Sequence, residues 1–105
     1  MRRGEVWWME LEPPIGRRPV LLLSRDEAYV KRESLIISPL TTQARDLPTE
    51  VPLGPEDGLP RRSVVNLDVI MTVRKSRSRQ RIAYLSPEKR AAVERAIHFA
   101  LDLRD

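Results

Sequence analysis

Short apolar runs separated by proline and glycine make up most of this sequence, and such punctuation is typical of folds built from short strands. The 105 residues include nine prolines and four glycines, which lie mostly between the apolar runs. The runs predict seven strands, within residues 5–11, 19–24, 35–40, 49–53, 63–67, 69–73 and 81–85. Because these strands do not alternate with helices, the sequence indicates a mainly antiparallel sheet rather than a parallel α/β sheet.

One helix is predicted near the C-terminus. Ser86 suits the N-cap, Pro87 the first helical position, and Glu88 the positive end of the helix dipole. The apolar residues expected to face the sheet are Val93, Ile97, Ala100 and Leu101. The charged residues expected to face solvent are Lys89, Arg90, Glu94, Arg95 and Asp102. The elements together indicate one domain over residues 1–105, a small, curled barrel that is mainly β with a C-terminal helix. Because proline cannot donate to a sheet, Pro52 indicates that the strand within residues 49–53 lies at an edge.

Composition excludes several classes of protein. The longest apolar runs, such as residues 20–23, are far shorter than the roughly 20 residues that span a bilayer, so no membrane segment is expected. No long apolar stretch follows the first residues, so no secretory signal is expected. The absence of cysteine excludes disulfides and thiolate metal sites, which agrees with a cytoplasmic location.

Arginine dominates the charge of the chain. Nineteen basic residues against 15 acidic ones give a net charge of +4, and 16 of the basic residues are arginine. This excess favours a polyanionic partner, because the planar guanidinium can hold phosphate oxygens with two hydrogen bonds. A GC-rich genome or a thermophilic source would produce the same bias, so the positions of the arginines have to decide its meaning.

Several common catalytic groups are absent. The one histidine, His98, lies four residues from both Glu94 and Asp102, which places it on the solvent face of the predicted helix. A pair of catalytic histidines is therefore excluded, and a Ser-His-Asp triad is not expected. The acidic residues are scattered without ligand-like spacing and no glycine-rich phosphate loop is present, so neither a metal nor a cofactor is expected.

Two polar segments are candidates for a site. Arg17 and Arg18 follow Gly16 in the first predicted inter-strand loop, and Pro19 restrains Arg18 to an extended conformation. The second segment follows the third predicted strand, where side chains leave the sheet and can face a ligand; it comprises Thr41, Thr42 and Gln43. Either segment taken alone is more typical of an ordinary turn, and the spacing does not prove that the two segments meet.

The most basic segment is residues 74–81, which contain five cations and no acid. In an extended conformation Lys75, Arg77, Arg79 and Arg81 would share one face and could follow a nucleic-acid backbone. The alternative is a solvated edge kept basic to prevent strand pairing. The adjacent Trp7–Trp8 pair should divide between the two faces of its strand, with one indole packed inside.

Six segments of the chain resemble the corresponding segments of the MazF/PemK (Kid) toxin family. The matching segments keep the order and spacing of the family over nearly the whole chain; they are residues 1–8, 16–21, 39–43, 47–51, 70–77 and 85–88. The resemblance implies a homodimer of SH3-like barrels, the fold of the CcdB, PemK and MazF plasmid-maintenance toxins. It implies a toxin of a type II toxin–antitoxin system, an mRNA interferase that cuts single-stranded RNA at short sequences without a metal. The products are a 2′,3′-cyclic phosphate and a 5′-hydroxyl, and a cognate MazE-like antitoxin holds the toxin inactive.

The resemblance also implies roles for individual residues. The family's catalytic arginine matches Arg18, which would stabilise charge on the phosphate and pass a proton to the leaving oxygen. Its catalytic threonine matches Thr41, which would hydrogen-bond a non-bridging oxygen. The residues expected to bind RNA are Arg17, Thr42, Gln43, Lys75, Arg77 and Arg79.

The sequence departs from the family pattern in two places. Only residues 14–16 separate Pro13 from Arg17, where many relatives carry a longer loop, and residues 68–72 read Asp-Val-Ile-Met-Thr instead of the frequent Asp-Gln-Ile-Arg-Thr. Two alternatives stay open, and the shortened loop supports the second of them. One is a non-enzymatic toxin of the same fold that binds a protein target such as DNA gyrase, and the other is an inactive RNA-binding member.

Overall fold

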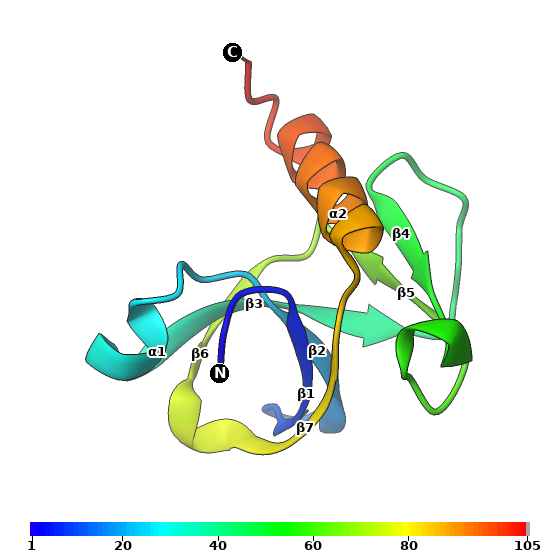
Figure 1. Cartoon of the computed structure of the whole chain (residues 1–105). Helices are drawn as coiled ribbons and strands as arrows, with labels where there is room; N and C mark the ends of the chain where they lie inside the picture. The colour runs from blue at the N-terminus through cyan, green and yellow to red at the C-terminus, as the bar shows by residue number, and fades with distance from the viewer. Residues whose placement is uncertain (105) are drawn as a thin grey trace.

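The computed structural model describes residues 1–104, which form a seven-stranded sheet with a C-terminal helix (Figure 1). In chain order the elements are β1 (Glu5–Glu10), β2 (Arg17–Leu22), α1 (Ala28–Lys31), β3 (Ser34–Thr41), β4 (Glu50–Leu53), η1 (Pro55–Asp57), β5 (Ser63–Asn66), β6 (Met71–Arg74), η2 (Lys75–Arg77), β7 (Ser78–Tyr84) and α2 (Pro87–Ala100). The six strand pairings of the sheet are all antiparallel, as the sequence predicts.

The long strand β3 organises the sheet. The strand order is β4-β5-β3-β2-β1-β7, and β6 also pairs with β3. One edge of β3 carries β2, whereas the other carries β6 along residues 34–37 and β5 along residues 40–41. The predicted edge strand β4 lies at one end of the order, beside α2 (Figure 1). Register shifts between β1 and β7 mark bulges, which increase the local twist and curl the sheet into a half-barrel.

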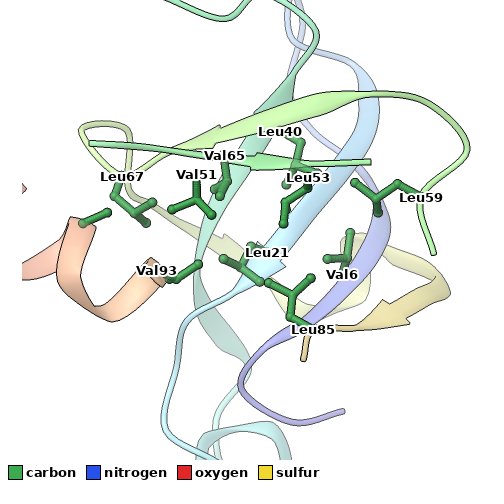
Figure 2. Packing of buried hydrophobic residues seen from close by; sticks show 11 residues of the cluster. Val6, Leu21, Leu40, Val51, Leu53, Leu59, Val65, Leu67, Leu85 and Val93 are labelled. Atoms are coloured by element: carbon green, nitrogen blue, oxygen red, sulfur yellow. The ribbon is translucent and has the colours of Figure 1, made fainter. Parts of the chain in front are cut away.

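The two faces of the sheet bury separate apolar clusters. Along β2, Leu21 belongs to one cluster while Val20 and Leu22 belong to the other, because successive strand residues point to opposite faces. The first cluster is covered by α2, and Figure 2 shows Val93 reaching from the helix toward Leu21. The second comprises Met9, Leu11, Val20, Leu22, Tyr29, Leu35 and Ile37.

The start of α2 confirms the predicted cap. The Ser86 hydroxyl accepts a hydrogen bond from the main-chain N–H of Lys89 at 3.2 Å, and Pro87 is the first helical residue. Among residues 1–104, no helix is long and apolar enough to cross a membrane.

The faces of α2 differ from the prediction at three positions. Ala96 is buried together with Val93, while Leu101 is 54% exposed because the helix ends at Ala100. Arg90 does not face solvent freely, since its guanidinium carbon lies 4.6 Å from the centre of the Tyr84 ring.

Element boundaries also differ from the predicted ones. The second strand begins at Arg17 rather than Pro19, so Arg17 and Arg18 belong to β2 and not to the preceding loop. The sixth strand begins at Met71 and the seventh at Ser78. The structure adds the short helical segments α1, η1 and η2. Each has only three or four residues, which is too few for a helical periodicity to be recognised in the sequence.

Candidate active site

The pairing of β2 with β3 brings Arg18 and Thr41 together. Arg18 is the second residue of β2, and Thr41 is the last residue of β3. The two strands are antiparallel, with Val20 opposite Pro39, so the start of β2 lies beside the end of β3. Both candidate catalytic residues line one cavity of about 400 Å³.

Four segments of the chain form this cavity. Trp8 contributes from β1, and the start of β2, the end of β3 and the segment leading into β5 complete the wall. The lining residues are Trp8, Arg17, Arg18, Pro19, Leu40, Thr41, Thr42, Leu59, Pro60, Arg61 and Ser63. A cavity of this size falls in the range of sites that hold small ligands or parts of larger ones.

The charge of the cavity is entirely positive. Three arginines line it, Arg17, Arg18 and Arg61, and the lining residues drawn from positions 1–104 include no acid. A second cavity, of about 380 Å³ beside the N-terminal turn, is lined by charges of both signs: Arg3, Arg90, Asp26 and Glu94. Of these two cavities, the Arg18 cavity has the charge that suits a polyanion.

Each arginine of β2 keeps donors free for a ligand. Arg18 is partly buried, and its Nη1 donates to the main-chain oxygen of Leu40 at 3.4 Å. Arg17 is exposed, with its Nη1 3.9 Å from Glu10 Oε1 and its guanidinium carbon 5.2 Å from the centre of the Trp8 ring. A guanidinium carries five N–H donors, so neither contact set exhausts its capacity.

The hydroxyl of Thr41 is oriented by the chain that follows it. The main-chain N–H of Gln43 donates to Thr41 Oγ1 at 3.2 Å. This contact occupies a lone pair of the hydroxyl oxygen and leaves its hydrogen available for donation. Thr42 also lines the cavity, whereas Gln43 is exposed beside it.

The prediction of a single basic row over residues 74–81 is wrong. Residues 75–77 form the 3₁₀ turn η2, which breaks the period of two. The Lys75 Nζ donates to the main-chain oxygen of Tyr29 at 2.7 Å, and Arg77 is paired with Glu12. The Arg79 guanidinium donates to the main-chain oxygen of Ser76 at 2.9 Å.

These basic residues are not among those that line the Arg18 cavity. Lys75 lines a different cavity with Arg74 and Glu33, and Arg81 is 3.0 Å from the buried carboxylate of Glu5. The predicted RNA-binding residues therefore divide into a group in or beside the cavity, which comprises Arg17, Thr42 and Gln43, and a group outside it, which comprises Lys75, Arg77 and Arg79.

The tryptophans divide as expected between the two faces of β1. Trp7 packs against the second apolar cluster, and its indole N–H donates to Glu5 Oε1 at 2.9 Å. Trp8 lines the Arg18 cavity, although neither indole is fully exposed.

Sequence reasoning missed one wall of the cavity. Leu59, Pro60, Arg61 and Ser63 belong to a segment that the sequence suggested only as a turn and the start of a strand. The available signal was the Arg61-Arg62 pair beside Pro60, which resembles the Arg17-Arg18 pair beside Pro19.

The structure places His98 away from the Arg18 cavity. It is partly exposed on α2, next to Glu94 and Arg95. Within the described part of the chain, no three His, Cys, Asp or Glu residues are grouped in a way that could hold a metal ion.

The chain matches the family model of the PemK-like, MazF-like toxin of type II toxin–antitoxin systems over residues 2–101. The probable endoribonuclease MazF5 of Mycobacterium tuberculosis is 43% identical over 101 residues, which are 95% of this chain and 92% of that protein. Endoribonuclease EndoA of Bacillus subtilis is 31% identical over 113 residues, with 100% of this chain and 97% of that protein covered.

Solved structures give the same picture. The Mycobacterium tuberculosis toxin MazF-mt6 has a TM-score of 0.88 at 32% identity and covers 96% of this chain and 99% of its own. An endoribonuclease from a mycobacterial species, in complex with its cognate antitoxin, also has a TM-score of 0.88, at 28% identity, with 100% of this chain and 98% of its own covered. These matches confirm the predicted fold class, which is mainly β with a C-terminal helix and is the fold of MazF toxins.

Proposed function

Since the chain belongs to the family of PemK-like, MazF-like toxins of type II toxin–antitoxin systems, we propose that it is a sequence-specific endoribonuclease toxin that cleaves single-stranded RNA. Relatives at 43% and 31% identity bear the name endoribonuclease. The observation that carries the proposal is a cavity that both Arg18 and Thr41 line and to which residues 1–104 contribute no acidic side chain. Such a cavity suits a phosphodiester, and mRNA is the proposed target.

The proposed reaction uses the substrate's own nucleophile and no resident metal. The 2′-oxygen of one nucleotide forms a bond to the adjacent phosphorus, and the bond from phosphorus to the 5′-oxygen breaks. The 2′-hydroxyl loses one proton and the departing 5′-oxygen gains one, which leaves a 2′,3′-cyclic phosphate and a 5′-hydroxyl. The protein has to stabilise the extra negative charge that gathers on the phosphate oxygens during this exchange.

Arg18 and Thr41 are the proposed catalytic residues. The Arg18 guanidinium supplies positive charge and several N–H donors, one of which is directed at the leaving 5′-oxygen and assists its protonation. The Thr41 hydroxyl donates to a non-bridging oxygen, and this role is supported by the Gln43 N–H, which leaves the hydroxyl hydrogen free.

Arg17, Thr42 and Gln43 are proposed to bind the RNA around the scissile bond. Arg17 and Thr42 line the cavity, and the exposed Gln43 follows Thr42 in the chain. Lys75, Arg77 and Arg79 are proposed as backbone contacts outside the cavity, where electrostatic attraction does not need a common row.

The proposed partners are those of the relatives. A cognate MazE-like antitoxin would inhibit the toxin in the cytoplasm, and two copies of the chain would form a homodimer. Exposed apolar side chains offer surface for such contacts; they include Val30, Ile36, Val69 and Ile70.

The proposal is tested by incubating the purified protein with a long RNA of diverse sequence in EDTA and mapping the new 5′ ends. Cleavage at a recurring short sequence is expected from the wild type and should be lost in Arg18→Ala and in Thr41→Ala. Matched controls are Arg25→Ala and Thr72→Ala, which change exposed residues away from the cavity and should cleave normally.

Other outcomes would favour the alternatives. Binding of RNA without cleavage would identify an inactive RNA-binding member, and the absence of both would favour a toxin that acts on a protein target. Cleavage that persists in both cavity variants would show that the catalytic residues are assigned wrongly.

A further inference from the structure

We propose that Arg61 is an additional RNA-binding residue, which holds a backbone phosphate next to the scissile one. The proposal rests on the proposed function and extends it to a part of the chain that the family motifs do not include. Arg61 approaches the cavity from the segment between η1 and β5, whereas Arg17 and Arg18 approach it from β2. A substrate in the cavity would therefore meet cations from two separate walls.

The main chain around Arg61 is held in place. Leu59, two residues earlier, is 4% exposed and is part of the core cluster drawn in Figure 2. Pro60 restricts the backbone between them. The Ser63 hydroxyl then donates to the main-chain oxygen of Arg61 at 3.3 Å. The side chain thus extends from a fixed point, which reduces the conformational entropy lost when it binds a ligand.

The guanidinium of Arg61 has no partner within the part of the chain that the structure describes. Among residues 1–104, no carboxylate lies within ion-pair distance of it and no side-chain hydrogen bond forms from it. Its neighbour Arg62 differs, because its two terminal nitrogens donate to Glu56 at 3.0 and 2.8 Å. Arg62 is thus occupied by an intramolecular ion pair, whereas Arg61 lines the cavity without an ion-pair partner among residues 1–104.

The three cavity arginines differ in the partners that they already have. Arg18 lies beside Thr41 and is assigned to the scissile phosphate, and Arg17 is shared with Glu10 and the Trp8 ring. Within residues 1–104, Arg61 has neither a carboxylate nor an aromatic partner to compete with a ligand. RNA carries one negative charge per nucleotide, so a strand whose scissile phosphate lies at Arg18 places a second phosphate within the same cavity or at its rim. Arg61 offers a cation for that phosphate without first having to give up another partner.

A phosphate contact predicts a defined change in behaviour. Removal of Arg61 should weaken binding of every RNA to a similar extent, because the backbone carries no sequence information. The slope of log Kd against log salt should fall by about 0.7, the value for one lost contact to a single strand. In cleavage assays KM should rise while kcat stays nearly the same, because a phosphate that does not itself react is held equally in the ground state and the transition state.

The test compares Arg61→Ala with Arg62→Ala and Arg61→Lys. Binding is measured by fluorescence anisotropy at several salt concentrations. The RNA contains the cleavage sequence, and 2′-O-methylation blocks its cleavage. Arg61→Ala should raise Kd about tenfold, which is the effect of losing roughly one charge-assisted hydrogen-bonded contact, and should lower the salt slope. Arg61→Lys should retain the slope because it keeps the charge, and Arg62→Ala should resemble the wild type. Thermal unfolding of each variant checks that the fold is kept.

The results separate this inference from the proposed function. Equal Kd and slope for Arg61→Ala and Arg62→Ala, in a protein whose Arg18→Ala variant is inactive, would overturn only the role of Arg61. A protein that binds RNA through Arg61 but cleaves none would overturn the proposed activity and leave this inference standing. A wild-type protein that binds no RNA would overturn both.

Discussion

The Nη1 atom of Arg18 lies 3.4 Å from the main-chain oxygen of Leu40, the residue that precedes Thr41. This contact joins the start of β2 to the end of β3 at the point where the two candidate catalytic side chains leave the sheet. Its length makes it a weak hydrogen bond, so the guanidinium is positioned by it but still has donors to offer. Such a weak contact suits a guanidinium that has to exchange a main-chain oxygen for a phosphate oxygen when the substrate binds.

Replacement of Arg18 by lysine should separate geometry from charge. Lysine keeps the positive charge but cannot present a planar set of donors to the phosphate. We expect kcat for RNA cleavage to fall about 100-fold or more, as when one donor to a transition-state oxygen is lost. The control is Arg25→Lys, which alters an exposed arginine that binds Glu27 at 2.7 Å. Full activity of Arg18→Lys would show that charge alone is sufficient.

Gly58 should be harder to replace than Gly16. Both have positive φ, 94° and 68°, so alanine at either position carries a backbone penalty of about 1 kcal/mol. At Gly58 the new Cβ would also lie 3.1 Å from the Cβ of Ala83, whereas at Gly16 it meets nothing within 4 Å. Urea denaturation should therefore give a lower free energy of unfolding for Gly58→Ala than for Gly16→Ala. Equal losses would mean that the contact with Ala83 relaxes freely.

The carboxylate of Glu5 should make stability depend on pH. Burial acts to raise its pKa, but hydrogen bonds from the Trp7 indole, the Arg2 main-chain N–H and the Arg81 guanidinium outweigh burial, and the pKa lies below the ordinary 4.5. A carboxylate with a depressed pKa stabilises the fold above its unfolded-state pKa, and this contribution is lost as the pH falls through the folded-state value.

We therefore expect Glu5→Gln to lower the free energy of unfolding at neutral pH by about 1–3 kcal/mol, the cost of disrupting a buried hydrogen-bonded group. The difference from the wild type should shrink as the pH is lowered below 4.5. Urea denaturation across this pH range measures it, with Glu27→Gln as a control on an exposed carboxylate. A constant difference at every pH would contradict the assigned role of the Glu5 charge.

The basic residues outside the cavity give a separate prediction. Arg77 is paired with Glu12 and Arg79 with main-chain oxygens, so both have to exchange these partners to reach RNA. If they bind the backbone, the double variant Arg77→Ala/Arg79→Ala should lower the salt slope of RNA binding by about 0.7 for each lost contact. An unchanged slope would identify the segment as a solvated edge.

Local signals predicted the strands that carry the site but not the site's full wall. Pro19 and the apolar run after it placed Arg18 next to a strand, and the polar residues after Pro39 placed Thr41 at a strand end. Which strands pair, and in which register, depends on contacts distant in the sequence. For that reason the entry of Arg61 into the same cavity could not be derived from its neighbours.

The error over residues 74–81 has a similar cause. Basic residues at every second position fit an extended strand, but tertiary contacts determine the conformation of this segment. The Lys75 main-chain N–H donates to the main-chain oxygen of Glu33 at 2.7 Å, and the Lys75 side chain donates to the main chain of α1. The end of α2 was overestimated because apolar spacing continues through Leu101 after the helix has stopped.

The most direct test of the central claim uses an RNA that contains one mapped cleavage site. In a second copy of this RNA, the nucleotide on the 5′ side of the scissile bond is 2′-deoxy, and the 3′ end of the upstream product is examined by mass spectrometry. The account predicts a 2′,3′-cyclic phosphate from the all-ribose RNA, no cleavage of the deoxy RNA, and loss of all product with Arg18→Ala. Cleavage of the deoxy RNA, or a product that ends in a 3′-hydroxyl, would contradict it.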